Sequence, residues 1–292
     1  MIRKILSTVK SHGIEDSFRK VYHRMSPQKI KTFSLFKSHY KEKTGLEIGG
    51  PSNYFSSNGL VPVYPIATMI DNCNFGDQTV WEGNISAGRH FVFNKDREPG
   101  KQYIAEASNL HFIEDSTYDF VLSSHCIEHL ANPLRGITEW VRVLKSGGIL
   151  TLIIPHKDGT FDHRRPVTSL EHLLLDFENN TTEHDLSHLE EVLKYHDLRK
   201  DSGAGDFESF RVRSINNYQN RCLHHHVFNT QLSIQMMHHM QLQILGVEVF
   251  RPYNIVIIAK KNEPDQIIDN SMFTGINHYW SSPFPSDQEV SN

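Results

Sequence analysis

A glycine turn and a later acid are the first residues whose types and spacing could do chemistry. The turn follows a short apolar run and reads Glu47-Ile48-Gly49-Gly50-Pro51, and the next carboxylate that ends an apolar run is Asp71. Glycines let a backbone approach a ligand closely, and an acid about 20 residues later can accept both ribose hydroxyls. This spacing indicates a nucleoside-cofactor site, and the alternative is an ordinary strand-to-helix corner.

Histidine is the second unusual feature. The chain has 19 histidines, most of them between His111 and His239. Histidine is the commonest metal ligand and titrates near neutral pH, so this enrichment favours metal binding or acid-base chemistry. His184 and His188 are four residues apart, and with one of His224, His225 or His226 they could bind zinc. The alternative is a polar histidine surface, since the lone Cys222 offers no cysteine pair.

The elements that must position these residues form an α/β pattern. A helix over residues 132–144 is predicted by the N-cap Asn132, by Pro133 and by the terminal Gly147-Gly148. It lies between two apolar runs, so strand, helix and strand form a crossover that needs a parallel sheet. The five predicted strands are residues 45–48, 65–71, 102–106, 118–123 and 148–155.

The rest of the chain is divided by composition. Residues 156–226 are polar and are predicted to be a helical cap inserted after the fifth strand, with helices near 168–175, 185–195 and 207–217. A helix over about 229–245 and two closing strands, paired as a hairpin about Pro252, complete a domain of residues 43–260. We expect residues 1–42 to be a basic helical extension and residues 261–292 to be a loosely attached tail.

Composition limits the cellular setting. No apolar run reaches the roughly 20 residues that span a bilayer. Cys73, Cys126 and Cys222 are far apart in the sequence, which suggests free thiols in a reducing compartment rather than a disulfide framework. We therefore expect a cytoplasmic protein. Residues 1–44 carry eleven Lys/Arg against three acids, so this basic arm could bind the inner face of an anionic membrane. The alternative is a solvated helical extension; no nucleic-acid motif accompanies the arm, and the oligomeric state is open.

One long string carries a family resemblance. It begins Tyr118-Asp119-Phe120-Val121, continues with Glu128-His129 and Pro133, and ends Val143-Leu144-Lys145-Ser146-Gly147-Gly148. The string resembles class I S-adenosylmethionine-dependent methyltransferases, whose usual form has proline at the position of Ser146. The resemblance covers residues 43–155 well and 227–260 by pattern. It implies a Rossmann-like, seven-stranded, mostly parallel sheet with helices on both faces, and S-adenosylmethionine as the cofactor.

The glycine turn departs from the family's usual E/D-x-G-x-G-x-G. Here Gly49 and Gly50 still admit the methionine moiety, whereas Pro51 stiffens the turn and removes a backbone donor. This form, together with the 161–166 and 221–226 segments, looks like a bacterial methyltransferase subgroup found near surface-polysaccharide genes.

The resemblance also implies roles for particular residues. Glu47, Gly49, Gly50 and Pro51 would line the methionine end, and Asp71 would bind the ribose. Ala107, Ser108 and Asn109 would flank the adenine, while Ser124 and His125 would lie beside the transferred methyl. These positions fit the carboxyl edge of the strands, where open α/β sheets bind ligands.

Catalysis would need a base or a metal near the methyl. His125 is the first candidate base, the alternative being that it only packs against the cofactor, and His163 in the cap is the second. Arg164 and Arg165 beside it could clamp a phosphate or carboxylate, or form a salt-bridged loop. His125-x-x-Glu128-His129 is similar to the metal site of coenzyme Q O-methyltransferases, which implies a candidate divalent ion at these three residues.

Three functions follow from these residues. The first is O-methylation of a sugar, glycan or phosphate-bearing intermediate, favoured by the subgroup resemblance and the polar cap. The second is O-methylation of a quinone or secondary metabolite, for which a more apolar cap is expected. The third is a non-catalytic cofactor-binding scaffold, against which the retained Glu47, Gly49, Asp71 and His125 argue.

Overall fold

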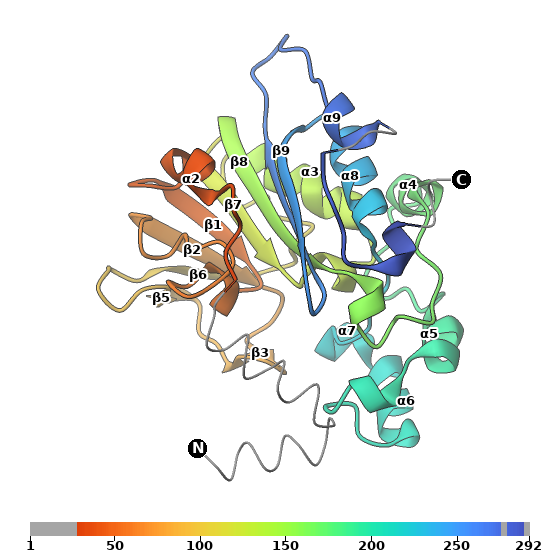
Figure 1. The fold of residues 1–292 in the computed structure, drawn as a ribbon. Coiled ribbons are helices and arrows are strands. Elements are labelled where there is room, and N and C mark those ends of the chain that lie inside the picture. The colour runs from red at the N-terminus through yellow and green to blue at the C-terminus, as the bar shows by residue number, and fades with distance from the viewer. Residues whose placement is uncertain (1–27, 276–278, 289–292) are drawn as a thin grey trace, which may run out of the picture.

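The computed structural model describes residues 28–275 and 279–288. Their main sheet is ordered β5-β6-β2-β1-β7-β8-β10-β9 (Figure 1). The strands are β1 (Thr44–Ile48), β2 (Met69–Asn74), β5 (Gly88–Phe91), β6 (Gly100–Ile104), β7 (Tyr118–Ser124), β8 (Leu144–Pro155), β9 (Gln243–Phe250) and β10 (Asn254–Lys260). The predicted Rossmann-like sheet is confirmed, but this part of the chain has eight main-sheet strands rather than seven, because β5 adds an antiparallel edge to β6.

Pairing in the sheet follows the predicted topology. β1 pairs in parallel with β2 and β7, and β7 pairs in parallel with β8. β10 is antiparallel to both β8 and β9, so the two closing strands do form a hairpin. A separate short ribbon pairs β3 (Gln78–Thr79) with β4 (Gly83–Asn84).

Helices cover one face of the sheet. α3 (Pro133–Val143) begins with the predicted Asn132 cap, whose side chain accepts from Arg135 N, and it buries Trp140. α8 (Thr230–His239) and α4 (Leu170–Glu178) add to the same core. The α4 cap is Ser169, which accepts from His172 N, so the helix predicted near residues 168–175 begins at Leu170.

The opposite face was predicted to carry helices as well, and among the described residues its core has a contribution from only one short α-helix. Apolar side chains alternate along the buried strands, so Val121 faces the helical core while Phe120 and Leu122 face the other. The second core is covered by the short α2 (Phe33–Phe36), by 3-10 turns and by irregular segments within residues 54–93. These segments bury enough bulk, including Tyr40 and Phe55, to replace helices there.

The described parts of the predicted extension and tail, residues 28–42, 261–275 and 279–288, contribute buried side chains. Residues 1–27 lie outside the described residues, but Ile30, Phe36 and Tyr40 are buried in the second core, so the folded domain begins before residue 43. In the tail, α9 (Ser271–Thr274) precedes buried Trp280 and Phe284. Among the helices that the structure describes, none combines the length and apolar character needed to cross a membrane.

The insertion after β8 is helical as predicted. It contains α4, α5 (Leu189–Tyr195), α6 (Phe207–Ile215) and α7 (Asn217–Asn220), with α5 and α6 standing apart from the sheet (Figure 1). α4 packs against α3 and α8 in the main core. The outer helices share a small separate core of Val192, Ala204, Phe210 and Leu223.

Candidate active site at the carboxyl edge of the sheet

The glycine turn leaves β1 at the carboxyl edge of the sheet. Gly49 has a φ of +79°, which glycine adopts without strain, and its N–H donates to Cys73 O at 2.9 Å. A Cβ on Gly50 would lie 2.3 Å from the Glu47 carboxyl carbon, so that position has no room for a side chain. The next element is the 3-10 turn Asn53–Phe55, so the turn is not a strand-to-helix corner.

The Glu47 carboxylate stabilises the turn through two hydrogen bonds. It is fully buried, its Oε1 accepts from Ser52 N at 3.0 Å, and its Oε2 accepts from the Tyr64 hydroxyl at 2.6 Å. Burial raises the pKa of Glu47 to about 8, and the Tyr64 hydrogen bond only partly offsets that effect. Glu47 is therefore placed to shape the turn rather than to face a ligand.

A cavity opens beside this turn, where β1, β2, β6 and β7 end. It measures about 510 Å³ when the space open to solvent is counted. Three residues that were predicted to bind the cofactor line it: Gly49, Ala107 and His125. The other lining residues are Ile48, Cys73, Asn74, Phe75, Trp81, Glu106, Cys126, His129, Leu130 and Arg221.

Asp71 lies away from this cavity. Its Oδ1 accepts from Lys101 N and its Oδ2 from the Tyr118 hydroxyl, each at 2.7 Å. The predicted strand 65–71 is wrong by about three residues, because residues 65–68 are turn and β2 runs from Met69 to Asn74. The pairing of Ile48 with Cys73 then places Asn74, not Asp71, at the carboxyl edge.

Several other predicted cofactor residues are also outside the lining. Pro51 is exposed and faces a neighbouring depression, together with Gly50, on the other side of the turn. Asn109 is exposed and its Oδ1 contacts His111 Nδ1 at 2.9 Å, while Ser108 and Ser124 are only half-buried neighbours of lining residues. The structure thus replaces the predicted 107–109 triplet by Glu106 and Ala107.

His125 lines the cavity, and one of its ring nitrogens is fixed by a hydrogen bond. Its Nε2 lies 2.9 Å from Asn254 Oδ1, so in this amide orientation Nε2 carries the hydrogen and Nδ1 carries the lone pair. The ring stacks on Tyr54 with centroids 5.2 Å apart and meets Tyr253 edge-on at 5.4 Å. Burial lowers the pKa of His125 to about 4, so the imidazole is neutral at physiological pH.

The predicted metal triad is not assembled as expected. Glu128 and His129 do lie together, but the third ligand-type group in that cluster is His224 rather than His125, which is turned to Asn254. His224 Nδ1 lies 2.5 Å from Asp162 Oδ2. Burial alone would lower the pKa of His224, but the Asp162 carboxylate raises it above its ordinary value.

The cap residues predicted to reach the substrate are held by ion pairs. His163 and Arg164 both contact Asp197 Oδ2 at 3.1 Å, and neither lines the cavity. Arg165 is buried and donates to Asp162, Glu191 and the His224 carbonyl. The alternative of a salt-bridged loop therefore describes this segment better than a substrate clamp.

Arg221 is a lining residue that sequence reasoning did not assign. Its guanidinium pairs with Glu106 and lies 3.1 Å from Glu183 Oε2, between the faces of Phe75 and Tyr218. Residues 221–226 were singled out only as a subgroup-like run. No local sequence pattern marks this position of Arg221, because it depends on a contact with Glu106, which is 115 residues away in the sequence.

Comparison with known families and structures adds to this geometry. Residues 76–152 match the family described as "Methyltransferase domain", a stretch that holds β6, β7, α3 and most of β8. No curated protein matches the chain. The matched stretch includes the whole string from Tyr118 to Gly148 but not the Gly49 turn.

Solved structures with a similar chain path include three methyltransferases. A SAM-dependent methyltransferase from Aquifex aeolicus is 12% identical, with a TM-score of 0.41 over 82% of this chain and 93% of that one. A putative S-adenosylmethionine-dependent methyltransferase from Listeria monocytogenes is 17% identical, with a TM-score of 0.42 over 79% and 98%. An S-adenosylmethionine-dependent methyltransferase from Mesorhizobium loti is 12% identical, with a TM-score of 0.44 over 78% and 97%.

Proposed function

We propose that this chain transfers a methyl group from S-adenosylmethionine to a hydroxyl oxygen of a sugar, glycan or phosphate-bearing intermediate. The observation that carries the proposal is the cavity at the carboxyl edge of the sheet, which Gly49 and His125 both line, with His125 Nε2 held by Asn254. Open α/β sheets bind their ligands at this edge.

The lining residues suit the parts of the cofactor. Gly49 has no side chain where a methionine moiety would pass. Asn74 at the end of β2 donates its Nδ2 to Gly50 O at 3.1 Å, so its amide oxygen is the group proposed to accept from ribose hydroxyls. Phe75 and Ala107 supply apolar surface for an adenine, and Glu106 supplies a carboxylate beside it. When bound, the cofactor supplies an electrophilic methyl on its sulfonium.

His125 is the proposed base for the acceptor hydroxyl. Its Nδ1 accepts the hydroxyl proton while Nε2–H stays bonded to Asn254, which fixes both the ring orientation and the tautomer. The stacked ring of Tyr54 restricts the imidazole further. Holding the acceptor oxygen in line with the methyl supplies much of the rate in such a displacement.

Metal assistance would require the other cluster at this edge, Glu128, His129 and His224. His224 is tied to Asp162, whose carboxylate favours the protonated imidazole over the neutral ligand form. His125 is therefore favoured over a metal as the means of activating the acceptor.

A polar acceptor is favoured by the groups around His125. Tyr54 and Tyr253 pack against its ring and Asn254 contacts its Nε2, so hydroxyl and amide groups surround the imidazole, although none of these three residues lines the cavity itself. A quinone ring would favour a wall with fewer hydrogen-bonding groups. The sugar or glycan acceptor is thus our first choice over the quinone or secondary-metabolite acceptor.

The test combines binding with turnover. Isothermal titration of the full chain with S-adenosylmethionine should show binding at micromolar cofactor, and its absence at high micromolar concentration would sink the enzyme proposal. A panel of hydroxylated sugars, sugar phosphates and quinones, assayed by S-adenosylhomocysteine release, then separates the acceptor classes. Turnover with quinones alone would overturn the sugar assignment.

A further inference from the structure

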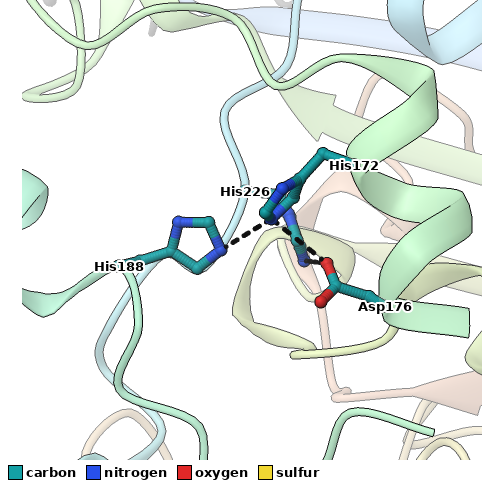
Figure 2. Close-up of side chains that lie close together, drawn as sticks. All are labelled: His172, Asp176, His188 and His226. Atoms are coloured by element: carbon teal, nitrogen blue, oxygen red, sulfur yellow. Dashed lines mark hydrogen bonds and ion pairs between the residues drawn. The ribbon is translucent and has the colours of Figure 1, made fainter. Parts of the chain in front are cut away.

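Four side chains from separate parts of the insertion converge at one point away from the cavity (Figure 2). His172 and Asp176 are four residues apart on α4, His188 precedes the first turn of α5, and His226 lies on the segment that returns to α8. Their ligand-type atoms all lie within 4.8 Å of one another. None of the four lines the cavity at the carboxyl edge.

We propose that these four side chains bind a zinc ion that fastens the outer helices of the insertion to the methyltransferase core. Three imidazoles and one carboxylate form a donor set that zinc accepts. Four protein ligands leave no open position on a tetrahedral ion, so the site is structural rather than catalytic. This inference does not depend on the proposed activity.

The distances fit a tetrahedral ion. Zinc–nitrogen and zinc–oxygen bonds of about 2.0–2.2 Å place neighbouring ligand atoms roughly 3.3–3.6 Å apart. The Nε2 atoms of His172 and His188 are 3.1 Å apart, and Asp176 Oδ2 lies 3.3 Å from His172 Nε2 and 3.7 Å from His226 Nε2. These separations approximate the edges of such a tetrahedron.

The hydrogen bonding of the Asp176 carboxylate also favours a bound cation. Within residues 28–275 and 279–288, the buried Asp176 Oδ2 has no hydrogen-bond donor, although three imidazoles surround it. Its other oxygen accepts from the Thr181 hydroxyl at 2.9 Å, a contact that orients the carboxylate. His226 Nε2 lies 3.2 Å from Ala131 O, so metal binding requires this ring to carry its hydrogen on Nδ1.

Access and position explain what the ion would do. The His226 side chain is fully buried while His172 is 40% exposed, which leaves an entry path from solvent. α4 packs on the main core, whereas α5 belongs to the small outer core, which has only four buried apolar residues. A core of that size gives little stability by itself, and a bound metal is a common remedy in small units.

The ion would also steady the segment beside the cavity. His225, next to the proposed ligand His226, donates its N–H to Glu128 O at 2.8 Å, and His224 contacts the ring of His129, which lines the cavity. Fixing His226 therefore fixes the residues that close this side of the active site.

Zinc content of the full-length protein tests the proposal. After chelation and dialysis against zinc, mass spectrometry should find one tightly held ion per chain in the wild type. His188→Ala and Asp176→Asn should each weaken zinc binding by more than about 100-fold, because each removes a ligand. The matched control is His184→Ala, since His184 stacks on Tyr218 outside the cluster and its loss should leave zinc affinity unchanged.

Two further measurements keep the test decisive. Circular dichroism confirms that each variant is folded, and cobalt(II) should give the visible absorption of a tetrahedral ion in wild type but not in His188→Ala. His129→Ala probes the Glu128 cluster and should retain its zinc. Absence of tight zinc binding by the wild type, equal affinity in His188→Ala, or loss of zinc only in His129→Ala would overturn the assignment.

Discussion

His125 at the cavity edge and the three histidines that converge between α4 and α5 are held in different ways. At the cavity edge, His125 has Nε2 fixed by Asn254 and its ring held between Tyr54 and Tyr253. In the α4–α5 cluster, imidazole nitrogens of His172, His188 and His226 converge around one carboxylate. A single free nitrogen facing a cavity can move a proton, whereas converging nitrogens are suited to hold a cation.

The comparison also separates what each group does for the protein. The cavity-edge histidine should matter for the rate and little for stability. The α4–α5 cluster should matter for stability and little for the rate. Four predictions test this division, in order of decreasing effect on turnover.

The largest effect is expected from removing the proposed base. His125→Ala should lower turnover by about 10²–10⁴-fold, the usual contribution of general-base catalysis, while S-adenosylmethionine binding survives. Single-turnover kinetics and isothermal titration on the same preparation measure both quantities. Near-normal turnover would remove His125 from the mechanism.

A smaller loss of turnover is expected when the His125 ring is no longer held in one orientation. Asn254→Ala removes the acceptor for His125 Nε2–H, so turnover should fall by about 10–100-fold with little change in the KM for the cofactor. Asn109→Ala is the matched control, because Asn109 is exposed and outside the cavity. Equal kinetics in the two variants would argue against a positioning role for Asn254.

The pH dependence of the rate tests the buried state of His125. Burial lowers its pKa to about 4, so the base stays neutral and active as pH falls from 8 to 5. An ordinary histidine with a pKa near 6.5 would lose about 30-fold over that range. We expect kcat/KM to change by less than about twofold between pH 8 and 5, and an inflection near 6.5 would contradict the assignment.

Metal removal should have the smallest effect on turnover and a clear effect on stability. If zinc is present at about 100 times its Kd, chelation removes about 2.7 kcal/mol of stabilisation, which corresponds to a fall in Tm of roughly 5–10 °C. Turnover at 25 °C should stay essentially unchanged, because none of the four proposed ligands lines the cavity. Complete loss of turnover on chelation, restored by zinc in His188→Ala, would instead place the metal at the cavity.

Local sequence patterns predicted the central strands and the helix between β7 and β8 well. Asn132 and Pro133 started α3 as expected, and the apolar run of residues 149–154 lies within β8. The covering of the second face was not predictable in this way, because irregular segments such as residues 54–67 have no periodicity to detect. Their contribution is burial, which depends on what they pack against.

The sequence predicted residues of the candidate site correctly only where they directly follow a strand. Gly49, Ala107 and His125 follow β1, β6 and β7 closely, so an error of one or two residues did not move them off the edge. Asp71 was misplaced because its strand begins four residues later than its apolar run. The positions of Arg221 and His224 at the cavity edge could not be predicted from the sequence, because the path of the helical insertion determines where this segment returns to the sheet.

By itself, the sequence determined the elements with strong periodicity, the turn at Gly49, the position of His125 after its strand and the polar nature of the insertion. Only the tertiary structure decided that Asn74 replaces Asp71 at the edge, that His224 joins Glu128, and that His172 and His226 meet across 54 residues. The physical reason is that propensity, capping and periodicity act over a few residues. Register and the paths of the connecting loops, which are determined by packing of the whole chain, bring distant side chains together.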